Sequence, residues 1–341
     1  MRVAMYYNNK DIRIKDIPVP EIGPGELLMK TVASGVCGSD TMEWYRRPKA
    51  PLVLGHEVAG KIIKVGKEIK KFKTGDRIVA THHVACNTCY YCFRGNHSAC
   101  QTLRSTHFDP GGFSELIRVP AINVDRGVLT IPDNVSYEEA SFVEPLGCVV
   151  RGHRLAGFQL GCSVAVLGCG MTGLLNLQHA IAQGASRIFG IDISDFKLST
   201  AKKLGADHII SATDEVDRII RNNNEGRLAD FVIVCTGASP AIEQALSLVE
   251  LGGTILYFAP GDPDYNFNFN FNNIWWKGIK IISSYAAAQS DLYTAMELIT
   301  YGRINVSALI THRIPLDEIQ KGFDLVTESA DSIKVIIEPN R

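Results

Sequence analysis

Short apolar runs occur along the whole chain, and the segments between these runs change in character near residue 160. Before that point, runs of β-type residues such as 27–32 and 77–80 stand between turns rich in Gly and Pro. Apolar runs of this length with turn residues on either side are typical of strands. The pattern predicts a compact β-rich domain over residues 1–147.

Apolar runs after residue 163 alternate with longer segments of helical periodicity. The runs are residues 164–167, 187–191, 231–234, 254–258 and 279–282. Strands that alternate with helices form βαβ units, in which the strands run parallel. We therefore expect a doubly wound parallel-sheet domain over residues 148–286.

From about residue 287 the pattern is mixed again, with a predicted helix at 291–300 and a predicted strand at 332–337. We assign residues 287–341 to the first domain, so the expected fold class is α/β with one β-rich and one parallel-sheet domain. In residues 266–272, Asn alternates with Phe267, Phe269 and Phe271, and this period predicts a strand with the three rings on one face. Such a strand at a sheet edge would pair with a second copy, so we expect a homodimer or homotetramer.

Charge and composition narrow the classes of function. The 341 residues include 35 Lys plus Arg and 36 Asp plus Glu, so the net charge of -1 draws the chain to neither nucleic acid nor anionic lipid. We find no signal-peptide pattern and no apolar run as long as a membrane span, and expect a cytoplasmic protein. Because cytoplasmic thiols stay reduced, the nine cysteines are expected to bind metal or lie buried.

Four cysteines stand close together in a turn-rich loop. Cys86, Cys89, Cys92 and Cys100 follow one another at intervals of three, three and eight residues. Four thiolates complete a tetrahedral zinc shell, and a shell filled by protein is structural. Zinc ribbons that bind nucleic acid use similar spacings, so the cluster alone does not indicate an enzyme.

A glycine-rich turn follows the first strand of the second domain, and a helix is expected from about Leu174. The turn consists of Gly168, Cys169, Gly170, Met171, Thr172 and Gly173. Glycines in this position let backbone amides approach a pyrophosphate at the helix N-terminus. Asp192 ends the next strand, nineteen residues after Gly173, where an acid holds a ribose 2′-hydroxyl and repels a 2′-phosphate. The turn predicts NAD rather than NADP, with Cys169 as a small packed side chain.

Three further residues are weak evidence when each is taken alone. Cys37 lies in a Gly-Val-Cys-Gly-Ser-Asp segment, and His56 and Glu57 follow nineteen and twenty residues later. Together with Val143-Glu144-Pro145, the four-cysteine loop and the glycine-rich turn, they stand in an order that resembles the zinc-containing medium-chain dehydrogenases. The likeness is to the sorbitol and threonine dehydrogenase branch, and it spans nearly the whole chain. It implies that the first domain is GroES-like and the second a Rossmann domain.

The resemblance implies a catalytic zinc in addition to the structural zinc. Cys37 and His56 would be ligands, with Glu57 or Glu144 as the acidic ligand, and the sequence leaves open which acid binds at rest. Zinc lowers the pKa of a bound oxygen, which prepares an alcohol to donate hydride. We therefore expect an NAD-linked dehydrogenase of a small-molecule alcohol.

The resemblance also suggests roles for neighbouring residues. Ser39 would take the substrate proton, Asp40 would accept from the second ring nitrogen of His56, and Lys197 would lie beside the adenosine ribose. Many relatives carry a His where this chain has Met42, so the onward proton path passes to the cofactor ribose, to water or to a His elsewhere. The ends of two strands, residues 235–237 and 258–260, are expected beside the nicotinamide.

Polyols or sugar alcohols rank first as substrates, threonine second and simple alcohols third, an order that rests on family analogy. Two other readings compete with this one. A zinc-free quinone or enone reductase of the same fold would use NADPH and need neither metal site. A zinc-stabilised protein that binds NAD as a sensor would catalyse no reaction.

Overall fold

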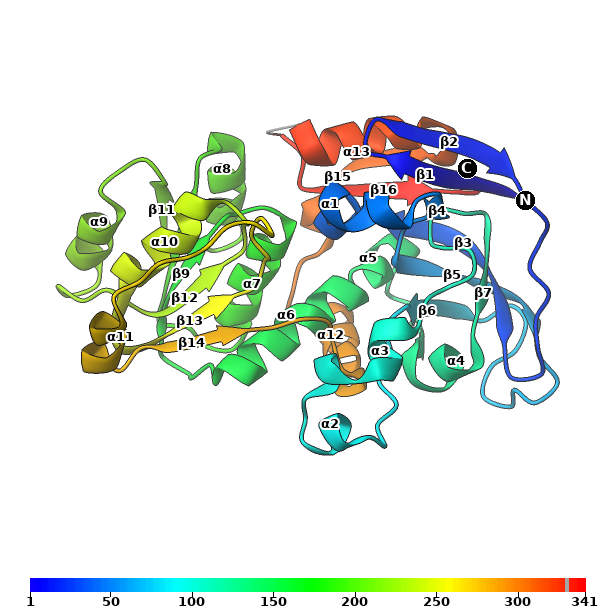
Figure 1. Cartoon of the computed structure of the whole chain (residues 1–341), viewed down its shortest axis with the longest axis horizontal. Helices are drawn as coiled ribbons and strands as arrows, with labels where there is room; N and C mark the ends of the chain where they lie inside the picture. The colour runs from blue at the N-terminus through cyan, green and yellow to red at the C-terminus, as the bar shows by residue number, and fades with distance from the viewer. Residues whose placement is uncertain (329–330) are drawn as a thin grey trace. The chain divides into compact units, whose positions relative to one another are not determined.

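Two structural units divide the chain in the computed structural model, which describes residues 1–328 and 331–341 (Figure 1). The first unit consists of Met1–Gly147, Ala286–Gly302 and Val306–Arg341. The second consists of Cys148–Tyr285 with Arg303–Asn305. The assignment of residues 1–147 and 287–341 to a zinc-binding domain, and of residues 148–286 to an NAD-binding domain, stays a prediction.

The first unit is built on two sheets. The larger sheet has the strand order β15-β16-β3-β5-β6-β8, with β7 paired to β3, and the smaller one has the order β2-β1-β4. The strands are β1 (Arg2–Asn8), β2 (Asp11–Asp16), β3 (Leu27–Gly35), β4 (Leu52–Val53), β5 (Glu57–Val65), β6 (Arg77–Thr81), β7 (Leu116–Val119), β8 (Val128–Thr130), β15 (Ile310–Pro315) and β16 (Lys334–Glu338). The C-terminal strands thus join the sheet that the N-terminal half begins.

Short helices connect these strands. They are α1 (Glu43–Arg46), α2 (Tyr90–Phe93), α3 (Gln101–Ser105), α4 (Ala121–Gly127), α5 (Tyr137–Ser141), α12 (Gln289–Thr300) and α13 (Ile319–Glu328), with 3-10 turns η1 (Gly38–Asp40), η2 (Arg47–Lys49), η3 (His97–Ala99), η4 (Ser307–Leu309) and η5 (Leu316–Glu318). Helix α6 (Val143–Ala156) begins in the first unit and ends in the second. Every helix in the described part of the chain is too short or too polar to cross a membrane.

The pairing of β3 with β5 forms the centre of the larger sheet. The two strands run antiparallel, with Leu27 opposite Val65 and Gly35 opposite Glu57. Leu27, Met29 and Ile62 are completely buried, which is the inward half of a two-residue alternation. The other half carries Lys30 and Lys61 into solvent. This pairing fixes where the chain segments just beyond Gly35 and just before Glu57 meet.

The second unit is a single parallel sheet between helices. Its strand order is β11-β10-β9-β12-β13-β14, and every neighbouring pair is parallel. The elements are β9 (Ser163–Leu167), α7 (Met171–Ala182), β10 (Arg187–Asp192), α8 (Asp195–Lys203), β11 (His208–Ser211), α9 (Val216–Asn223), β12 (Ala229–Val234), α10 (Ser239–Leu248), β13 (Val249–Tyr257), α11 (Phe271–Lys277) and β14 (Lys280–Ser283). In order of sequence this is 3-2-1-4-5-6, the arrangement of a Rossmann dinucleotide-binding domain.

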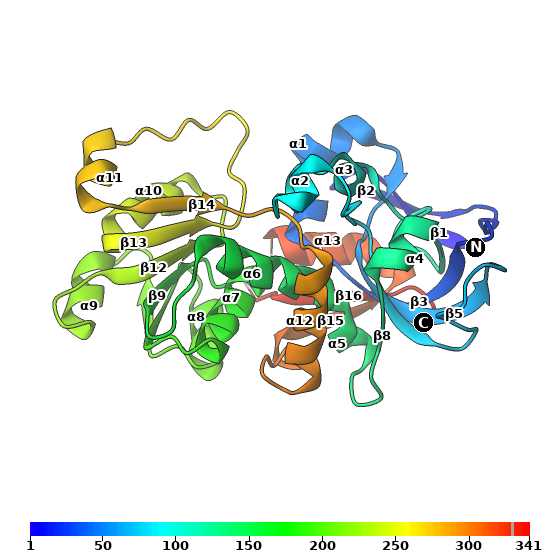
Figure 2. The ribbon, with the colours of Figure 1, turned by 90° about the horizontal axis from the view of Figure 1, so that it is seen from below.

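Helices cover both faces of this sheet, which explains the unbroken apolar strands. Figure 2 shows α7 and α8 on one face and α10 on the other. Ala165, Val166 and Val232 are completely buried although successive side chains point to opposite faces. The predicted α/β fold class is confirmed, and the predicted parallel sheet is present.

One predicted strand is wrong. The segment 266–270 forms no strand, and Phe271 begins α11 instead. Asn has a low strand propensity, and here the side chain of Asn270 caps α11 by accepting a hydrogen bond from the Asn272 backbone. Phe267 packs on Tyr257 with ring centroids 6.3 Å apart, while Phe269 and Phe271 are exposed. The edge of the sheet is β14, a few residues later.

Candidate active site

The four cysteines predicted to bind zinc lie together in the loop between β6 and α3. All four sulfur atoms lie within 4.8 Å of one another. The sulfur of Cys92 is 3.5 Å from that of Cys89 and 4.0 Å from that of Cys86. A tetrahedral zinc with Zn–S bonds of about 2.3 Å separates its sulfurs by about 3.8 Å. The observed spacing therefore fits a zinc ion bound by four thiolates.

Local hydrogen bonds prepare this loop for a metal. Hydrogen bonds from Thr88 lower the pKa of Cys86 to about 5, which favours the thiolate that zinc requires. The backbone amide of Cys86 also points at the sulfur of Cys100, at 3.4 Å. Asn87 has a φ of 57°, a left-handed conformation that Asn tolerates better than most residues. These contacts shape the loop around its four sulfurs.

A second group of possible ligands forms where β3 ends and β5 begins. The ligand atoms of Cys37, His56 and Glu57 lie within 4.8 Å of one another. Because Gly35 is opposite Glu57 in the antiparallel register, the residues that follow β3 and precede β5 meet at this end of the sheet. A sulfur, an imidazole and a carboxylate form a ligand set that suits zinc with one position left open.

The ring of His56 is oriented by a buried carboxylate. Its Nδ1 lies 3.3 Å from Oδ1 of Asp40, which is completely buried and also accepts a hydrogen bond from the Cys37 backbone at 3.1 Å. This is the contact that the sequence predicts for Asp40. Burial alone would lower the pKa of His56, but the Asp40 carboxylate and the contact with Cys37 raise it well above its ordinary value. Nδ1 is occupied by Asp40, so Nε2 is the nitrogen available to a metal.

The two carboxylate oxygens of Glu57 differ in their contacts: one is paired, and the other has no hydrogen-bond partner among the described residues. Its Oε2 pairs with Nζ of Lys334 on β16, and both side chains are completely buried. Nζ also donates to the Val36 carbonyl at 3.2 Å. Oε1 of Glu57 is buried and has no hydrogen-bond partner among the described residues. An orphaned carboxylate oxygen beside a sulfur and an imidazole is what a zinc ion would satisfy, so these residues fit the metal.

The close packing around this ion pair requires the glycine opposite it. A Cβ atom at Gly35 would lie 2.2 Å from Oε2 of Glu57 and 2.7 Å from Nζ of Lys334. Glu144, the other candidate acid, lies in the first turn of α6 and is 9% exposed. Its carboxylate is not among the ligand atoms that converge with Cys37 and His56. Of the two acids, the structure brings Glu57 to the cluster.

Ser39 lies beside the sulfur of Cys37. Its Oγ is 3.4 Å and its backbone nitrogen 3.5 Å from that sulfur. Arg46 on α1 folds back over the same turn, where Nε donates to the Ser39 carbonyl at 2.9 Å and Nη2 to Ser39 Oγ at 3.3 Å. Met42 precedes α1 as its N-cap residue. An arginine thus contacts the hydroxyl that the sequence assigns to proton transfer.

Three more histidines extend the cluster. The ring centroid of His82 is 4.6 Å from that of His56 and 3.7 Å from that of His83. The ring centroids of His83 and His107 are 5.7 Å apart. Burial, reinforced by His56 and His107, lowers the pKa of His83 to about 3. These imidazoles are neutral at neutral pH. They provide a histidine from elsewhere in the chain, one of the alternatives for the onward proton path.

Sequence reasoning missed Arg46, Lys334 and the three histidines. Lys334 had a visible signal, because it is a lone charge in the apolar run 333–337. A charge in such a run is buried and paired when the strand is central. Arg46 stands in a basic run that resembles any solvated turn, so nothing in the sequence separates it from Arg47.

The glycine-rich turn lies between β9 and α7 as expected. Gly168 has a φ of +90°, and a Cβ atom on Gly173 would lie only 1.8 Å from the Gly168 carbonyl oxygen. Gly170 is the N-cap residue, and α7 begins at Met171 rather than near Leu174, so Thr172 and Gly173 lie in its first turn. The amides of the first turn have no partner within the helix, and such amides form the anion-binding end of a helix.

Asp192 ends β10 beside this turn. It accepts hydrogen bonds from the backbone of Cys169 at 2.7 Å and of Ser194 at 2.9 Å. Lys197 is half-buried on α8, one turn after the Ser194 cap. Cys169 is completely buried, and burial raises the pKa of its thiol to about 12, so it is a packed side chain. Asp192 is thereby held at the carboxyl end of its strand, where Rossmann domains bind the ribose.

The ends of β12 and β13 touch each other. A Cβ atom on Gly237 would lie 2.5 Å from the Pro260 carbonyl oxygen. The segments 235–237 and 258–260 therefore lie together at the carboxyl edge of the sheet. That edge is where doubly wound sheets bind their ligands.

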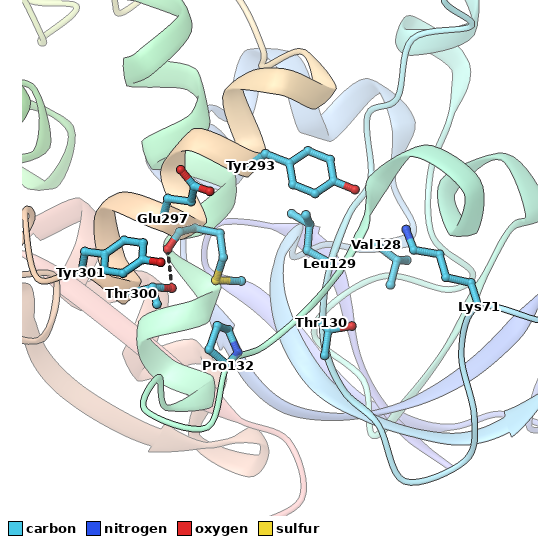
Figure 3. A pocket seen from close by; sticks show the side chains of 10 residues that line it. Lys71, Val128, Leu129, Thr130, Pro132, Tyr293, Glu297, Thr300 and Tyr301 are labelled. Atoms are coloured by element: carbon cyan, nitrogen blue, oxygen red, sulfur yellow. Dashed lines mark hydrogen bonds between the residues drawn. The ribbon is translucent and has the colours of Figure 1, made fainter.

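A separate hollow in the first unit lies between β8 and α12 (Figure 3). Its lining includes Lys71, Leu129, Tyr293 and Glu297, and Thr300 turns its hydroxyl back to the Met296 carbonyl at 2.7 Å. Neither ligand cluster contributes a residue to its lining. The candidate metal ligands therefore lie outside this hollow.

Comparisons with known proteins agree on one family. Residues 23–133 match the model of the alcohol dehydrogenase GroES-like domain, and residues 172–301 match that of the zinc-binding dehydrogenases. L-threonine 3-dehydrogenase of Bacillus velezensis is 33% identical over 335 residues, covering 96% of this chain and 95% of that protein. Sorbitol dehydrogenase of Ovis aries is 31% identical, covering 96% and 93%. A Sinorhizobium meliloti protein solved with NADP bound is 26% identical, with a TM-score of 0.88 and 99% of each chain covered.

Proposed function

The chain belongs to the zinc-binding alcohol dehydrogenase family, and we propose that it transfers hydride between NAD and a secondary alcohol of the polyol or sugar-alcohol type. As a member of this family it is a zinc-dependent oxidoreductase with a small-molecule substrate. The observation that carries the proposal is the convergence of Cys37, His56 and the orphaned Oε1 of Glu57. Both relatives named above support an alcohol that carries further polar groups.

Each residue of the catalytic cluster has a proposed task. Cys37 Sγ, His56 Nε2 and Glu57 Oε1 would hold the zinc, with Glu144 as an acid that replaces Glu57 in another state. When bound, the zinc supplies the Lewis acidity that lowers the pKa of an alcohol. Ser39 Oγ, which lies beside Cys37, would relay the alcohol proton by accepting it while its own hydroxyl proton passes to the cofactor ribose, to water or to a His elsewhere in the chain. Asp40 would keep His56 in one tautomer by accepting from Nδ1.

The four-cysteine loop would hold the structural zinc. Cys86, Cys89, Cys92 and Cys100 fill all four positions and leave none for a substrate. All nine cysteines are free thiols. Free thiols in this number suit a reducing compartment, so we propose a cytoplasmic protein.

The second unit would bind the nicotinamide cofactor. Gly168, Gly170, Met171, Thr172 and Gly173 would receive the pyrophosphate, while Asp192 and Lys197 would lie at the adenosine ribose. The Asp192 carboxylate would repel a 2′-phosphate, which favours NAD. Because one solved structure of the family binds NADP, rates with both cofactors need comparison.

We also propose that the chain forms a homodimer or homotetramer. Strand β14 is an edge of the parallel sheet, and one row of its backbone groups has no strand partner among the described residues. Beside it, Phe271, Trp275 and Trp276 are 67%, 61% and 76% exposed. Pairing of two β14 edges would cover both the backbone and these rings.

A screen of NAD reduction tests the proposal. Zinc-loaded protein is offered polyols, threonine, simple alcohols and sugar phosphates, with bound zinc measured in the same sample. We expect reduction of NAD by alcohols of the polyol type, neutral or anionic, ahead of threonine and simple alcohols, with two zinc ions per chain. No reduction by any alcohol would favour the sensor reading, and fewer than about one zinc per chain would favour the zinc-free reductase.

A further inference from the structure

Arg46 brings a positive charge to the proposed proton acceptor. Its segment, residues 43–49, carries three basic side chains and one acid. The guanidinium turns back from the end of α1 and donates to Ser39 through Nε and Nη2, at 2.9 and 3.3 Å. The Arg46 side chain is only 15% exposed. A cation has therefore been partly withdrawn from water within one hydrogen bond of the reactive hydroxyl.

The nearest carboxylate orients this cation without saturating it. Asp40 is completely buried, and its Oδ1 is shared between His56 Nδ1 at 3.3 Å and Arg46 Nη2 at 3.4 Å. Its Oδ2 accepts from the Cys37 backbone. Nη1 of Arg46 makes no hydrogen bond with any residue of the described ranges, so two N–H groups of the fork remain for a ligand.

Other charges in this region reinforce the positive sign. Lys49 lies over the Tyr45 ring, with Nζ 3.5 Å from its centroid. Burial, then the charges of Lys49 and Arg46, lower the pKa of His107. His82 lies in the same region, with its ring centroid 4.6 Å from that of His56. Its Nδ1 is buried and has no partner among the described residues, so it can hydrogen-bond a ligand.

We infer that the substrate alcohol carries an anionic group, a carboxylate or a phosphate, which Arg46 receives while Ser39 takes the alcohol proton. This inference rests on the proposed dehydrogenase function and names its substrate class. A guanidinium presents parallel N–H groups that match the oxygens of a carboxylate or phosphate. Asp40 lies 3.4 Å from Arg46 Nη2 and the Tyr45 ring centroid 4.8 Å from its Cζ, and an uncharged polyol would add no anion to the remaining N–H groups of this partly desolvated cation.

The distances limit where the anionic group stands on the substrate. The alcohol oxygen would lie about 3 Å from Ser39 Oγ, and Arg46 Nη2 lies 3.3 Å from the same atom. The alcohol oxygen then lies within about 6 Å of Arg46 Nη2, and an anion that accepts a hydrogen bond from this nitrogen lies within about 9 Å of the alcohol oxygen. A carboxylate one to three carbons from the carbinol lies within that reach. Threonine has such a carboxylate, but its ammonium group would face this positive region, because Asp40 and Glu57 are already paired with cations.

Matched substrate pairs test the inference. Hexonates of several configurations are compared with the hexitols of the same configuration, with hexitol phosphates and threonine as further arms. We expect kcat/KM to be at least about tenfold higher for an anionic member than for its neutral partner. The hexonate and phosphate arms then decide which anion the site takes.

Variants of the two neighbouring arginines locate the effect. Arg46→Gln should lower kcat/KM for the anionic substrate by about tenfold to a hundredfold more than for the neutral partner, the range of a charge-assisted hydrogen bond. The loss with the neutral partner measures the effect of Arg46 on Ser39 alone. Arg46→Lys should retain part of the preference. The control is Arg47→Gln, an exposed neighbour with no contact to Ser39, which should change neither.

A binding measurement separates recognition from turnover. Calorimetry with the same hexonate and no NAD should give a Kd at least about tenfold weaker for Arg46→Gln than for the parent chain. Equal or better kcat/KM for neutral polyols, or an unchanged Kd in Arg46→Gln, would overturn the inference and leave the dehydrogenase proposal intact. If no alcohol of any charge reduces NAD, the proposed function and this inference fail together.

Discussion

At the scale of single residues, the candidate metal centre depends on buried ionisable groups whose partners come from distant parts of the chain. Glu57 opens β5, and its partner Lys334 lies 277 residues later on β16. Asp40 joins His56 to Arg46. Sequence motifs locate Cys37, His56 and Glu57, but the pairing of Glu57 with Lys334 depends on the order of strands in the sheet. Long-range pairing of this kind is invisible to local spacing.

Replacement of Lys334 by Met tests the buried ion pair. Removing one partner leaves a carboxylate buried without a counter-charge, which costs about 3–5 kcal/mol. We expect Lys334→Met to lose that much free energy of unfolding in urea. The double variant Lys334→Met with Glu57→Gln should recover most of it, because no charge then remains. An equal free energy of unfolding for the single variant and the parent chain would show that the ion pair with Lys334 does not stabilise the buried Glu57 carboxylate.

The affinity of the catalytic cluster for zinc should fall as the pH falls. The raised pKa of His56 in the metal-free chain means that a proton competes with zinc for the imidazole. Below that pKa the His56 proton alone should raise the apparent Kd for zinc by about tenfold per pH unit. Above it this contribution should level off, and only the proton of the Cys37 thiol should still compete with zinc. Competition with a chelating dye at several pH values measures this.

Asp40→Asn is the matched variant for that titration. Without the carboxylate the pKa of His56 loses its main source of elevation, so the level region should extend to lower pH. Zinc should nonetheless bind about 10- to 100-fold more weakly above pH 8, because the ring is less firmly oriented. A profile identical to that of the parent chain would contradict the role of Asp40.

At the scale of elements, strand positions were predictable wherever burial is uniform. The runs near residues 164–167, 187–191 and 231–234 became β9, β10 and β12, since continuous apolar runs suit strands covered on both faces. The Asn and Phe alternation of 266–272 misled because the same period occurs here in a segment that forms no strand. Phe267 packs on Tyr257 and Phe269, and Phe271 begins α11. The start of α7 was placed three residues late, since Gly173 in its first turn conceals the helical pattern.

Gly173→Ala tests the turn that binds the dinucleotide. A Cβ atom there would meet the Gly168 carbonyl, so the turn must open. We expect a loss of about 1–3 kcal/mol in stability, as in overpacked sites, and at least a tenfold rise in the Kd for NAD. The control for folding is Gly170→Ala, where a Cβ atom would meet nothing within 4 Å. Thermal unfolding should separate the two variants, because only Gly173→Ala strains the turn, and NAD titration measures the rise in Kd of Gly173→Ala.

At the scale of the whole molecule, each structural unit has its own chemistry. The first contains both cysteine-based ligand clusters, and the second contains the glycine-rich turn and Asp192. The family resemblance predicted from the sequence that the metal ligands and the cofactor turn lie in different domains, because the family's motifs keep their order along the chain. The sequence did not predict the charge of the substrate, since the contact between Arg46 and Ser39 is visible only in the folded structure.

Assembly is tested at the exposed sheet edge. Ile281 on β14 is 38% exposed, and Trp276 beside it is 76% exposed. We expect light scattering to give a dimer or tetramer for the parent chain and a smaller species for the double variant Ile281→Lys with Trp276→Glu. Substitution of Leu160, which is 83% exposed and far from β14 in sequence, serves as the control. A monomeric parent chain would refute the assembly proposal.

The zinc content of Cys37→Ala tests the central claim most directly. The parent chain should bind two zinc ions and reduce NAD with an alcohol, whereas Cys37→Ala should keep one zinc, the parent's fold by circular dichroism, and less than about 1% of the activity. One zinc in both proteins, or a fully active Cys37→Ala, would contradict a catalytic zinc held by Cys37, His56 and Glu57.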